Sequence, residues 1–525
     1  MSVFSTQRLA HSIARNTLFG VVAKLAQVST RLVTIPIVIA HFGLGGYGVW
    51  SLIMTAAAYM RFGSVGIKSA FQKYVAEATG TGDYTEANRL LSTGCLLTMA
   101  FSCALLIPVA LFSGALARVA GVPPEFLGAA ANSMSVLAVI LLLSNGGAAF
   151  EAIVMGGHRV DLARHFTTLF TILEAVAIVL LLKLGFGLFA MACVMAVSEV
   201  GFVVCCAVAA RRVVPEIRIR REFVTARVVP ELFRFAGSYQ MVNFLEILYV
   251  SILPITLLRT FGAESAGIYA VANRFVSSVL MVPDALLIPV LSGGTMVYAS
   301  GKMEDMQRVI SKAFKVTLGL SLFPLAFLSL FGAGVVTAWT GQVNPAFPRV
   351  LPLVALSGLF YALSLLQLVL YRISGRASMD NIRQALRILV LFSLSVFAPR
   401  LGFYGVLGGL AMAELAGMLF MLFALTRVFK GFRARYLLDD TCRLMVATAF
   451  ALTAGIAAAR LPLPAIPGLR LAALVQLSVV TLACLAAGGP AVWMTKLLSA
   501  AEEQAVRNAL LPRRRLATAG AGTQH

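Results

Sequence analysis

The stretch NTLFGVVAKLAQVSTRLVTIPIVIAHFG, residues 16–43, is long and apolar enough to cross a lipid bilayer as a helix. It nevertheless carries two positive charges, Lys24 and Arg31, whose spacing of seven residues puts them on one face of that helix. A charge near the bilayer centre costs about 2.5–3.5 kcal/mol on insertion scales, so such residues generally face protein or water. The stretch therefore predicts a membrane helix whose charged face lines a polar interior.

The composition extends this prediction to the whole chain. Of the 525 residues, 59% are hydrophobic and only 12% are charged. A soluble chain of this length could not bury so much apolar surface, so we expect an all-α polytopic membrane protein. The net charge of +21 shows no clustering on a soluble domain, which argues against nucleic acid as a partner. Basic loops beside anionic membrane lipids explain the excess better.

Cysteine and histidine give no sign of a metal or cofactor site. The seven cysteines form no CxxC pair and lie mostly in apolar runs, and the five histidines have no ligand spacing. We therefore expect no metal and no cofactor. The first apolar run lacks a small-residue cleavage site, which favours a retained signal anchor over a cleaved signal peptide.

Hydropathy predicts about fourteen membrane-spanning helices joined by short connections. The predicted spans are 14–40, 47–67, 90–112, 126–150, 164–183, 186–209, 235–258, 265–290, 313–337, 350–371, 382–398, 403–426, 442–460 and 469–490. If the N-terminus is cytoplasmic, most of the 43 Lys and Arg residues fall in cytoplasmic segments. The charge pattern therefore predicts a multi-pass protein with both termini in the cytoplasm.

A weak internal repeat divides the chain into two halves. YGVWSL at 47–52 matches AGIYAV at 266–271, and one offset places Gly48 on Gly267 and Trp50 on Tyr269. Two six-helix pseudo-repeat halves plus two C-terminal helices follow, with the substrate site expected between the halves. The predicted parts are a first half 1–210, a basic interfacial linker 211–234, a second half 235–428, two further helices 429–498 and a basic tail 499–525.

Several motifs resemble a known family. Asn16, Pro36, FGLGGYGVW, FGSVGIKSAFQKYVAEATGTGDYTEANRLLSTG and a late helix VLGGLAMAELAGMLF are similar to Wzx-type oligosaccharide flippases of polysaccharide biosynthesis. Their superfamily, the MOP superfamily, also holds MATE exporters and lipid II flippases. The resemblance covers most of the chain. It implies transport of a polyprenyl-pyrophosphate-linked glycan from the inner to the outer leaflet of a bacterial inner membrane.

Four cations inside predicted helices are candidate substrate-binding residues. These are Lys24, Arg31, Arg61 and Arg274. Arginine can bind a phosphate through two hydrogen bonds, which suits a pyrophosphate. The resemblance adds that lipid II flippases carry cavity-facing basic residues on helices 1, 2 and 8. Two alternatives stay open: Arg61 could extend to the interface, and Lys24 and Arg31 could pair with a neighbouring Glu.

Carboxylates inside predicted helices are candidates for ion coupling, because an isolated buried carboxylate tends to hold a proton. Glu246 is the first choice, and it shares a face with Asn243. The alternative is that Glu246 pairs with Arg274 or Lys24 and only holds the halves together. The further candidates are Glu174, Glu199 and Asp284; Glu414 also falls in mid-helix.

The sequence thus predicts a flippase that works by alternating access, with a cationic central cavity for the pyrophosphate–sugar head. The glycan would be an exopolysaccharide, O-antigen or capsule repeat unit. A MATE-like ion-coupled exporter of small molecules is the alternative. No GxxxxGK[ST] motif and no large outward loop are present, so we expect no enzyme activity. A polysaccharide polymerase and a chain-length regulator are the candidate protein partners.

Overall fold

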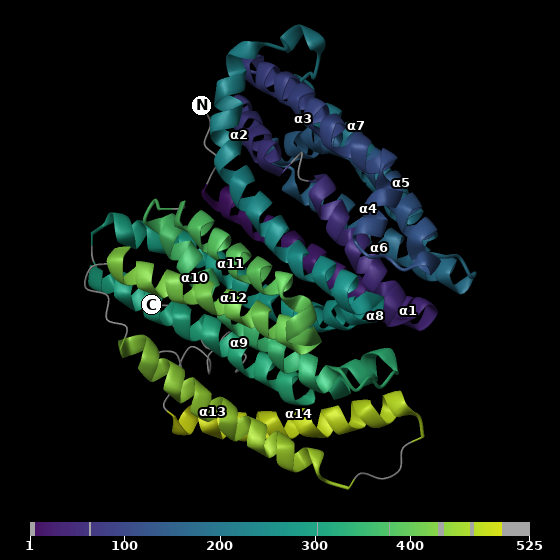
Figure 1. The fold of residues 1–525 in the computed structure, drawn as a ribbon. Helices are drawn as coiled ribbons and strands as arrows, with labels where there is room; N and C mark the ends of the chain where they lie inside the picture. The colour runs from purple at the N-terminus through teal and green to yellow at the C-terminus, as the bar shows by residue number, and fades with distance from the viewer. Residues whose placement is uncertain are drawn as a thin grey trace, which may run out of the picture. The chain divides into compact units, whose positions relative to one another are not determined.

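The structure is a computed structural model that describes the backbone of residues 6–61, 65–301, 303–376, 378–428, 435–462 and 467–495 (Figure 1). Side chains are described from Gln27 onward, except at Arg31 and a few further positions. Within these ranges the chain is helical and contains no strand. The protein is therefore an all-α polytopic membrane protein, as the sequence predicts.

Fourteen α-helices and two short 3₁₀ turns follow one another along the described chain. They are α1 (Thr6–Met60), α2 (Val65–Thr81), α3 (Thr85–Leu111), α4 (Ser113–Val119), α5 (Pro124–Gly156), α6 (Val160–Lys183), α7 (Leu188–Val213), η2 (Arg221–Phe223), η3 (Ala226–Val228), α8 (Val229–Ala299), α9 (Met303–Thr340), α10 (Phe347–Ile373), α11 (Ser378–Val396), α12 (Ala398–Val428), α13 (Arg435–Ala459) and α14 (Leu469–Met494).

Two glycines break the longest helices into pairs of spans. Gly43 in α1 has φ 70° and ψ −180°, and Gly262 in α8 has φ 86° and ψ 174°. Glycine adopts this backbone conformation without steric penalty, because it has no Cβ atom. The two positions are related by the same offset that places Gly48 on Gly267. The same backbone geometry thus recurs at two positions that this offset relates.

Eleven of the described helices are long and apolar enough to cross a membrane. Two of them, α1 and α8, each contain two of the predicted spans, separated at Gly43 and Gly262. A further predicted span corresponds to α11. This helix is not among the eleven, because three charged residues, Asp380, Arg383 and Arg387, lie within its 19 residues. The predicted span 47–67 extends too far, because α1 ends at Met60.

The chain forms two compact units. Unit 1 comprises residues 1–278, 344–361 and 375–422, and unit 2 comprises 279–343, 362–374 and 423–525. These boundaries cut through α8, α10 and α12. The five-part division drawn from the sequence stays a prediction.

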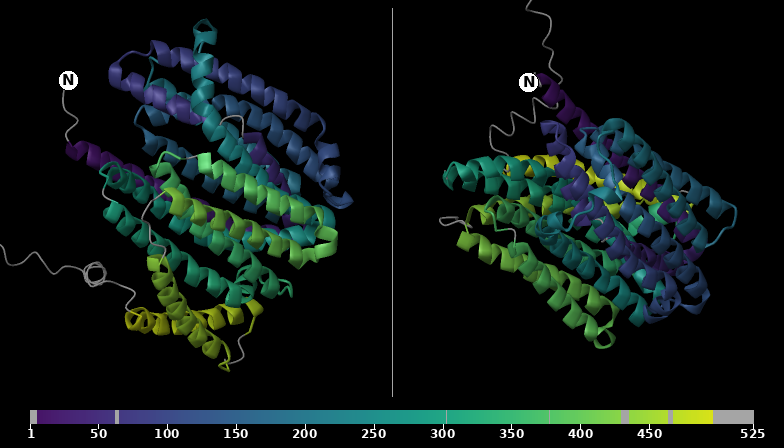
Figure 2. Two further views of the ribbon diagram at one scale, coloured as in Figure 1. Left: turned by 60° about the vertical axis from the view of Figure 1, so that its left-hand side comes forward. Right: turned by 90° about the horizontal axis from the view of Figure 1, so that it is seen from above.

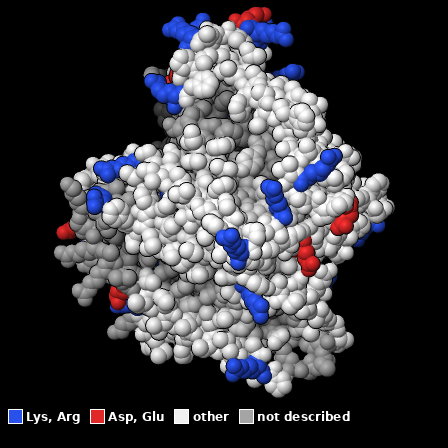
Figure 3. Space-filling model, viewed as in Figure 1, with Lys and Arg blue, Asp and Glu red and all other residues white. Residues whose placement is uncertain are grey.

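The helices of the first half pack closely within unit 1. The helix α5 contacts α7, α3, α2 and α1, and α6 lies against α1 and α7 (Figures 1 and 2). Small residues allow these approaches: a Cβ on Gly156 would lie 2.6 Å from Val75 Cβ. Figure 3 shows a face on which uncharged side chains predominate, as expected of helices that contact lipid.

The linker between the halves is fixed to α3 by side chains of that helix. Asn88 accepts a hydrogen bond from Arg218 N (2.8 Å) and donates to Glu216 O (3.3 Å). Ser92 accepts from Arg220 N, and Thr93 accepts from Thr225 N (3.1 and 3.0 Å). Three apolar side chains of the linker are buried in the core of the first half, Val214, Ile217 and Val228. The arginines of the linker stay exposed.

The start of α8 is also bonded to the first half. The Tyr74 hydroxyl of α2 donates to Glu231 at 2.5 Å. Burial and the adjacent Glu231 carboxylate raise the pKa of Tyr74. The hydroxyl therefore keeps its proton, and with it this hydrogen bond, to higher pH than an ordinary tyrosine.

Unit 2 contains the helices α9, α13 and α14, which pack together. Their core includes Leu452, Val480 and Cys484, with Phe327 and Phe331 of α9 packed against it. Arg470 at the start of α14 donates to Thr340 O at the end of α9 (2.6 Å). This bond satisfies one of the carbonyls that a helix end leaves unpaired.

Candidate functional site

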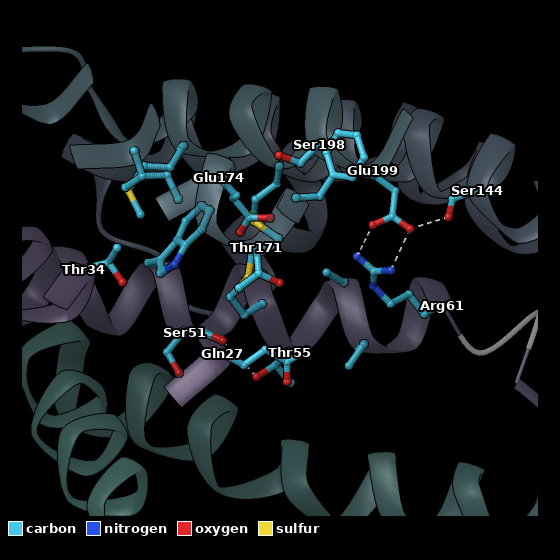
Figure 4. Close-up of a pocket in the computed structure, with 18 of the residues that line it drawn as sticks. Gln27, Thr34, Ser51, Thr55, Arg61, Ser144, Thr171, Glu174, Ser198 and Glu199 are labelled. Carbon is cyan, nitrogen blue, oxygen red and sulfur yellow. Dashed lines mark hydrogen bonds and ion pairs between the residues drawn. The ribbon is translucent and has the colours of Figure 1, made fainter. Parts of the chain in front are cut away.

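A cavity of about 1090 Å³ lies within unit 1. Side chains from α1, α2, α5, α6, α7 and α8 line it, and Figure 4 shows part of this lining. A membrane protein places charged groups around such a space because lipid cannot solvate them. The cavity is therefore the natural place to look for the predicted site.

Helical spacing brings the polar lining residues to one face of each helix. On α1, Ser51 and Thr55 lie four residues apart, and Arg61 follows six residues later, directly after the helix. On α6, Arg164, Thr167, Thr171 and Glu174 repeat at intervals of three and four residues. Two polar ladders thus run along the cavity wall.

Arg61 and Glu199 form the best-defined ion pair of the cavity. The Arg61 Nη1 and Nη2 atoms lie 2.9 Å from Glu199 Oε1 and Oε2, respectively, which is a two-point contact (Figure 4). Ser144 of α5 also donates to this carboxylate. Arg61 is 45% exposed and Glu199 18% exposed. The pair neutralises a predicted substrate-binding cation with a predicted coupling acid.

A second ion pair joins Lys68 of α2 to Glu151 of α5. Both residues line the cavity. Neither is a site candidate in the sequence, because each falls just beyond the end of a predicted span, 47–67 for Lys68 and 126–150 for Glu151. Their meeting depends on the packing of α2 against α5.

Three further charged residues line the cavity: Arg164, Glu174 and Arg274. Arg164 has no ion pair with any residue whose side chain is described. The described lining thus holds four basic residues and three acidic ones, so its formal charge is slightly positive.

Several lining hydroxyls have their hydrogen-bond donors already occupied. Thr34 donates to Thr30 O and Thr55 donates to Ser51 O, both at 2.9 Å. Thr167 donates to Ala163 O at 3.0 Å. A hydroxyl has one proton and two acceptor lone pairs, so these oxygens offer only acceptor positions to the cavity.

Only some of the predicted site residues lie together in the structure. Four of them line the cavity: Arg61, Arg274, Glu174 and Glu199. The side chains of Lys24 and Arg31 lie outside the described residues. Glu246 is not among the lining residues, and Asp284 is an exposed residue of unit 2.

Glu246 belongs instead to an ionic cluster around the buried Arg387 of α11. Arg387 Nη1 lies 3.5 Å from Glu246 Oε2, and its Nη2 atom donates to Glu414. Gln384 donates to Glu246, and Tyr249 donates to Glu414 at 2.8 Å. Among described side chains, the ionic partner of Glu246 is thus Arg387, where the sequence suggested Arg274 or Lys24.

Sequence reasoning missed Arg387, which is 1% exposed, and Arg383, which is 2% exposed. The charge pattern groups both with the basic cytoplasmic loop before α11. A signal was present: Asp380, Arg383, Gln384 and Arg387 recur at intervals of three and four, so they share one face of a helix.

The cavity offers no metal centre among the described residues, because no group of three His, Cys, Asp or Glu ligands occurs there. What the lining can do is bind: guanidinium groups for an anion, and hydroxyl oxygens for hydrogen-bond donors.

Comparison with known proteins identifies the fold. No protein-family model matches the chain, and no curated protein matches it. Among solved structures it is similar to the lipid II flippase MurJ in an inward closed conformation, with 15% identity over 91% of this chain and 99% of that one (TM-score 0.66).

It is also similar to MATE transporters. An inward-facing multidrug resistance MATE family transporter of the MOP superfamily shares 17% identity over 77% of this chain and 94% of its own (TM-score 0.59). The MATE multidrug transporter DinF-BH shares 16% identity over 81% of this chain and 97% of its own (TM-score 0.59). At these identities the likeness is one of fold.

Proposed function

We propose that the protein is a flippase that moves a polyprenyl-pyrophosphate-linked oligosaccharide across the bacterial inner membrane by alternating access. The supporting observation is the cavity of about 1090 Å³ in unit 1, lined by Arg61, Lys68, Arg164 and Arg274 among polar side chains. A site of this size and polarity inside a membrane unit suits a large hydrophilic head.

The head and the tail of such a substrate need different surroundings. The pyrophosphate would be bound by guanidinium groups, for which Arg274 and Arg164 are the described candidates, together with Lys24 and Arg31. The polyprenyl tail would remain in lipid. The carried glycan would be an exopolysaccharide, O-antigen or capsule repeat unit, handed on to a polymerase and a chain-length regulator.

The membrane potential can drive export of such a head. Moving one elementary charge through 100 mV is worth about 2.3 kcal/mol, and an anion leaving an inside-negative cell moves in the favourable direction. Glu174, Glu199, Glu246 and Asp284 are the candidates for a coupled ion. Both termini would be cytoplasmic, with anionic lipids at the basic loops.

An ion-coupled exporter of small molecules, similar to MATE transporters, is the second candidate. The observation that favours it is the presence of three carboxylates in the lining: Glu151, Glu174 and Glu199. Carboxylates suit a cationic compound. Two of the three are engaged by Lys68 and Arg61, which weakens this candidate.

A deletion strain separates the two functions. We expect loss of the protein to leave the lipid-linked repeat unit on the cytoplasmic leaflet, measured by labelling outer-leaflet glycan in spheroplasts. Complementation with Lys24→Gln/Arg31→Gln/Arg274→Gln should fail, although the variant inserts normally. Arg118→Gln is the control, since Arg118 is exposed and outside the cavity lining.

Two outcomes would contradict the proposal. One is normal outer-leaflet delivery in the deletion strain. The other is full export by the triple variant. Sensitivity to cationic compounds with unchanged glycan export would favour the exporter instead.

A further inference from the structure

The side-chain amide of Asn145 in α5 joins three helices at one buried point. Its Nδ2 atom donates to the carbonyl of Met60, the last residue of α1 (2.8 Å), and to the Ser102 hydroxyl of α3 (3.1 Å). All three residues are buried, and Asn145 is 4% exposed. The last carbonyls of a helix have no partner within it, and a buried one left unpaired costs about 1–3 kcal/mol. Asn145 thus fixes the point at which α1 ends.

The residue that follows this fixed point is Arg61. Asn145 holds the carbonyl of the planar peptide unit that joins Met60 to Arg61, so it also restricts where the Arg61 side chain begins. A long cationic side chain near a helix end can otherwise extend to the membrane interface. The structure instead places the Arg61 guanidinium on Glu199, in the cavity lining (Figure 4).

The neighbouring residue, Ser144, holds the other member of this ion pair. Figure 4 shows the Glu199 carboxylate bonded to both Ser144 and Arg61. Two consecutive residues of α5 therefore fix both ends of one ion pair. Ser144 binds the carboxylate, and Asn145 binds the backbone that leads to the guanidinium.

Two glycines after Asn145 let α5 approach the helices that carry the bonded groups. A Cβ on Gly146 would clash with Met99 of α3, and a Cβ on Gly147 would clash with Val203 of α7. Met99 and Val203 each lie about one helical turn from the group that α5 bonds on the same helix. The segment SNGG, 144–147, thus combines two hydrogen-bonding side chains with two close backbone approaches.

We propose that segment 144–147 is a positioning element that keeps Arg61 in the cavity as a preorganised anion-binding group. An ion pair between exposed side chains contributes only about 0–1 kcal/mol, because ordering two long side chains costs entropy. Ser144 and Asn145 order both partners in advance, which lowers this cost. An anion would reach Arg61 by replacing Glu199 as its partner. That this anion is a pyrophosphate rests on the function proposed above.

A double-mutant cycle tests the positioning without any ligand. Asn145→Leu removes the amide donor at nearly constant volume. We expect Arg61→Gln to lower the midpoint of thermal unfolding of the full chain in detergent, and this shift to fall by about half or more in the Asn145→Leu background. Ser133→Ala is the matched control, since Ser133 is buried in α5, donates to Ala129 O and does not line the cavity. It should leave the shift unchanged.

A second cycle covers the case in which Asn145→Leu does not fold. Ser144→Ala keeps the amide of Asn145 and removes only the hydrogen bond to Glu199. The shift caused by Glu199→Gln should therefore be smaller in the Ser144→Ala background than in the native one.

Binding of bare polyprenyl pyrophosphate in lipid nanodiscs measures the consequence for the site. We expect Arg61→Gln to weaken the Kd about ten- to a hundredfold, as for a hydrogen bond to a charged group. Asn145→Leu should weaken it in the same direction, and the two changes together should weaken it no further than Arg61→Gln alone. Ser133→Ala should bind as the native chain does.

Three results would overturn the positioning role. They are an unfolding midpoint that Arg61→Gln leaves unchanged, additive shifts in the cycles, and a native Kd in Asn145→Leu when Arg61→Gln weakens binding. If the native chain does not bind the bare lipid, the proposed function fails instead, and the unfolding cycles alone decide the positioning role.

Discussion

Gly48 of α1 and Gly267 of α8 meet backbone to backbone, and each contacts the residue four positions before the other. A Cβ on Gly48 would clash with Ala263 O and lie 2.7 Å from Gly267 N. A Cβ on Gly267 would clash with Leu44 O. Leu44 corresponds to Ala263 by the repeat offset. The contact is therefore reciprocal, like a contact between two subunits related by a two-fold axis.

This crossing should not tolerate a side chain. We expect Gly48→Ala or Gly267→Ala to destabilise the protein by about 1–3 kcal/mol, because backbone atoms must separate to admit a methyl group. The effect is measured by thermal unfolding, with size-exclusion chromatography as the readout of the protein that remains folded. Gly128→Ala is the control: a Cβ there meets nothing within 4 Å, so that variant should be neutral or slightly stabilised. Unchanged unfolding in both test variants would contradict the crossing.

The ion pair of Arg61 and Glu199 should control the affinity of the cavity for anions. We expect Glu199→Gln to strengthen binding of bare polyprenyl pyrophosphate, because it releases a guanidinium and removes a negative charge. Arg61→Gln should weaken binding. The measurement is the Kd in nanodiscs, with Glu216→Gln in the exposed linker as the control. Weaker binding by Glu199→Gln would count against this role.

Arg387 should be structurally indispensable. Arg387→Met leaves Glu414, which is 4% exposed, without its cationic partner, so we expect a loss of about 3–5 kcal/mol in unfolding free energy. Adding Glu414→Leu should recover part of the loss, because the buried carboxylate is removed. Thermal unfolding of the two variants in detergent tests this. A double variant less stable than the single one would refute the explanation.

The linker should become accessible to protease when its attachment to α3 is weakened. Asn88→Ala removes two hydrogen bonds, to Glu216 O and from Arg218 N. We expect faster trypsin cleavage after Arg218, Arg220 or Arg221, read by mass spectrometry of the fragments. Thr79→Ala is the control, because the Thr79 hydroxyl donates to Val75 O of its own helix. Equal cleavage rates would mean that the apolar contacts alone hold the linker.

The fold could be predicted largely from the sequence because lipid imposes a simple rule. Each span needs about 20 apolar residues with all backbone groups bonded internally, so hydropathy locates helices directly. The match of Gly48 with Gly267 indicated the repeat. Glycines at positive φ, such as Gly43 and Gly262, divide α1 and α8 where the sequence predicted separate spans.

The partners of the charged residues could not be predicted in this way. Hydropathy places Arg61 and Glu199 in helices but does not say that they meet across α1 and α7. The charge pattern alone groups Arg387 with a basic loop. The structure buries its guanidinium in a membrane helix, where Glu246 and Glu414, both remote from it along the chain, neutralise its charge.

The sequence by itself determined the helical type and the approximate positions of the membrane-spanning segments, because burial in lipid depends on the local run of apolar residues. Only the tertiary structure decided which charges line the cavity and which are neutralised, because Coulomb interactions depend on distances between helices that are remote along the chain. For that reason Arg274 and Glu174 line a common space while Glu246 pairs with the buried Arg387.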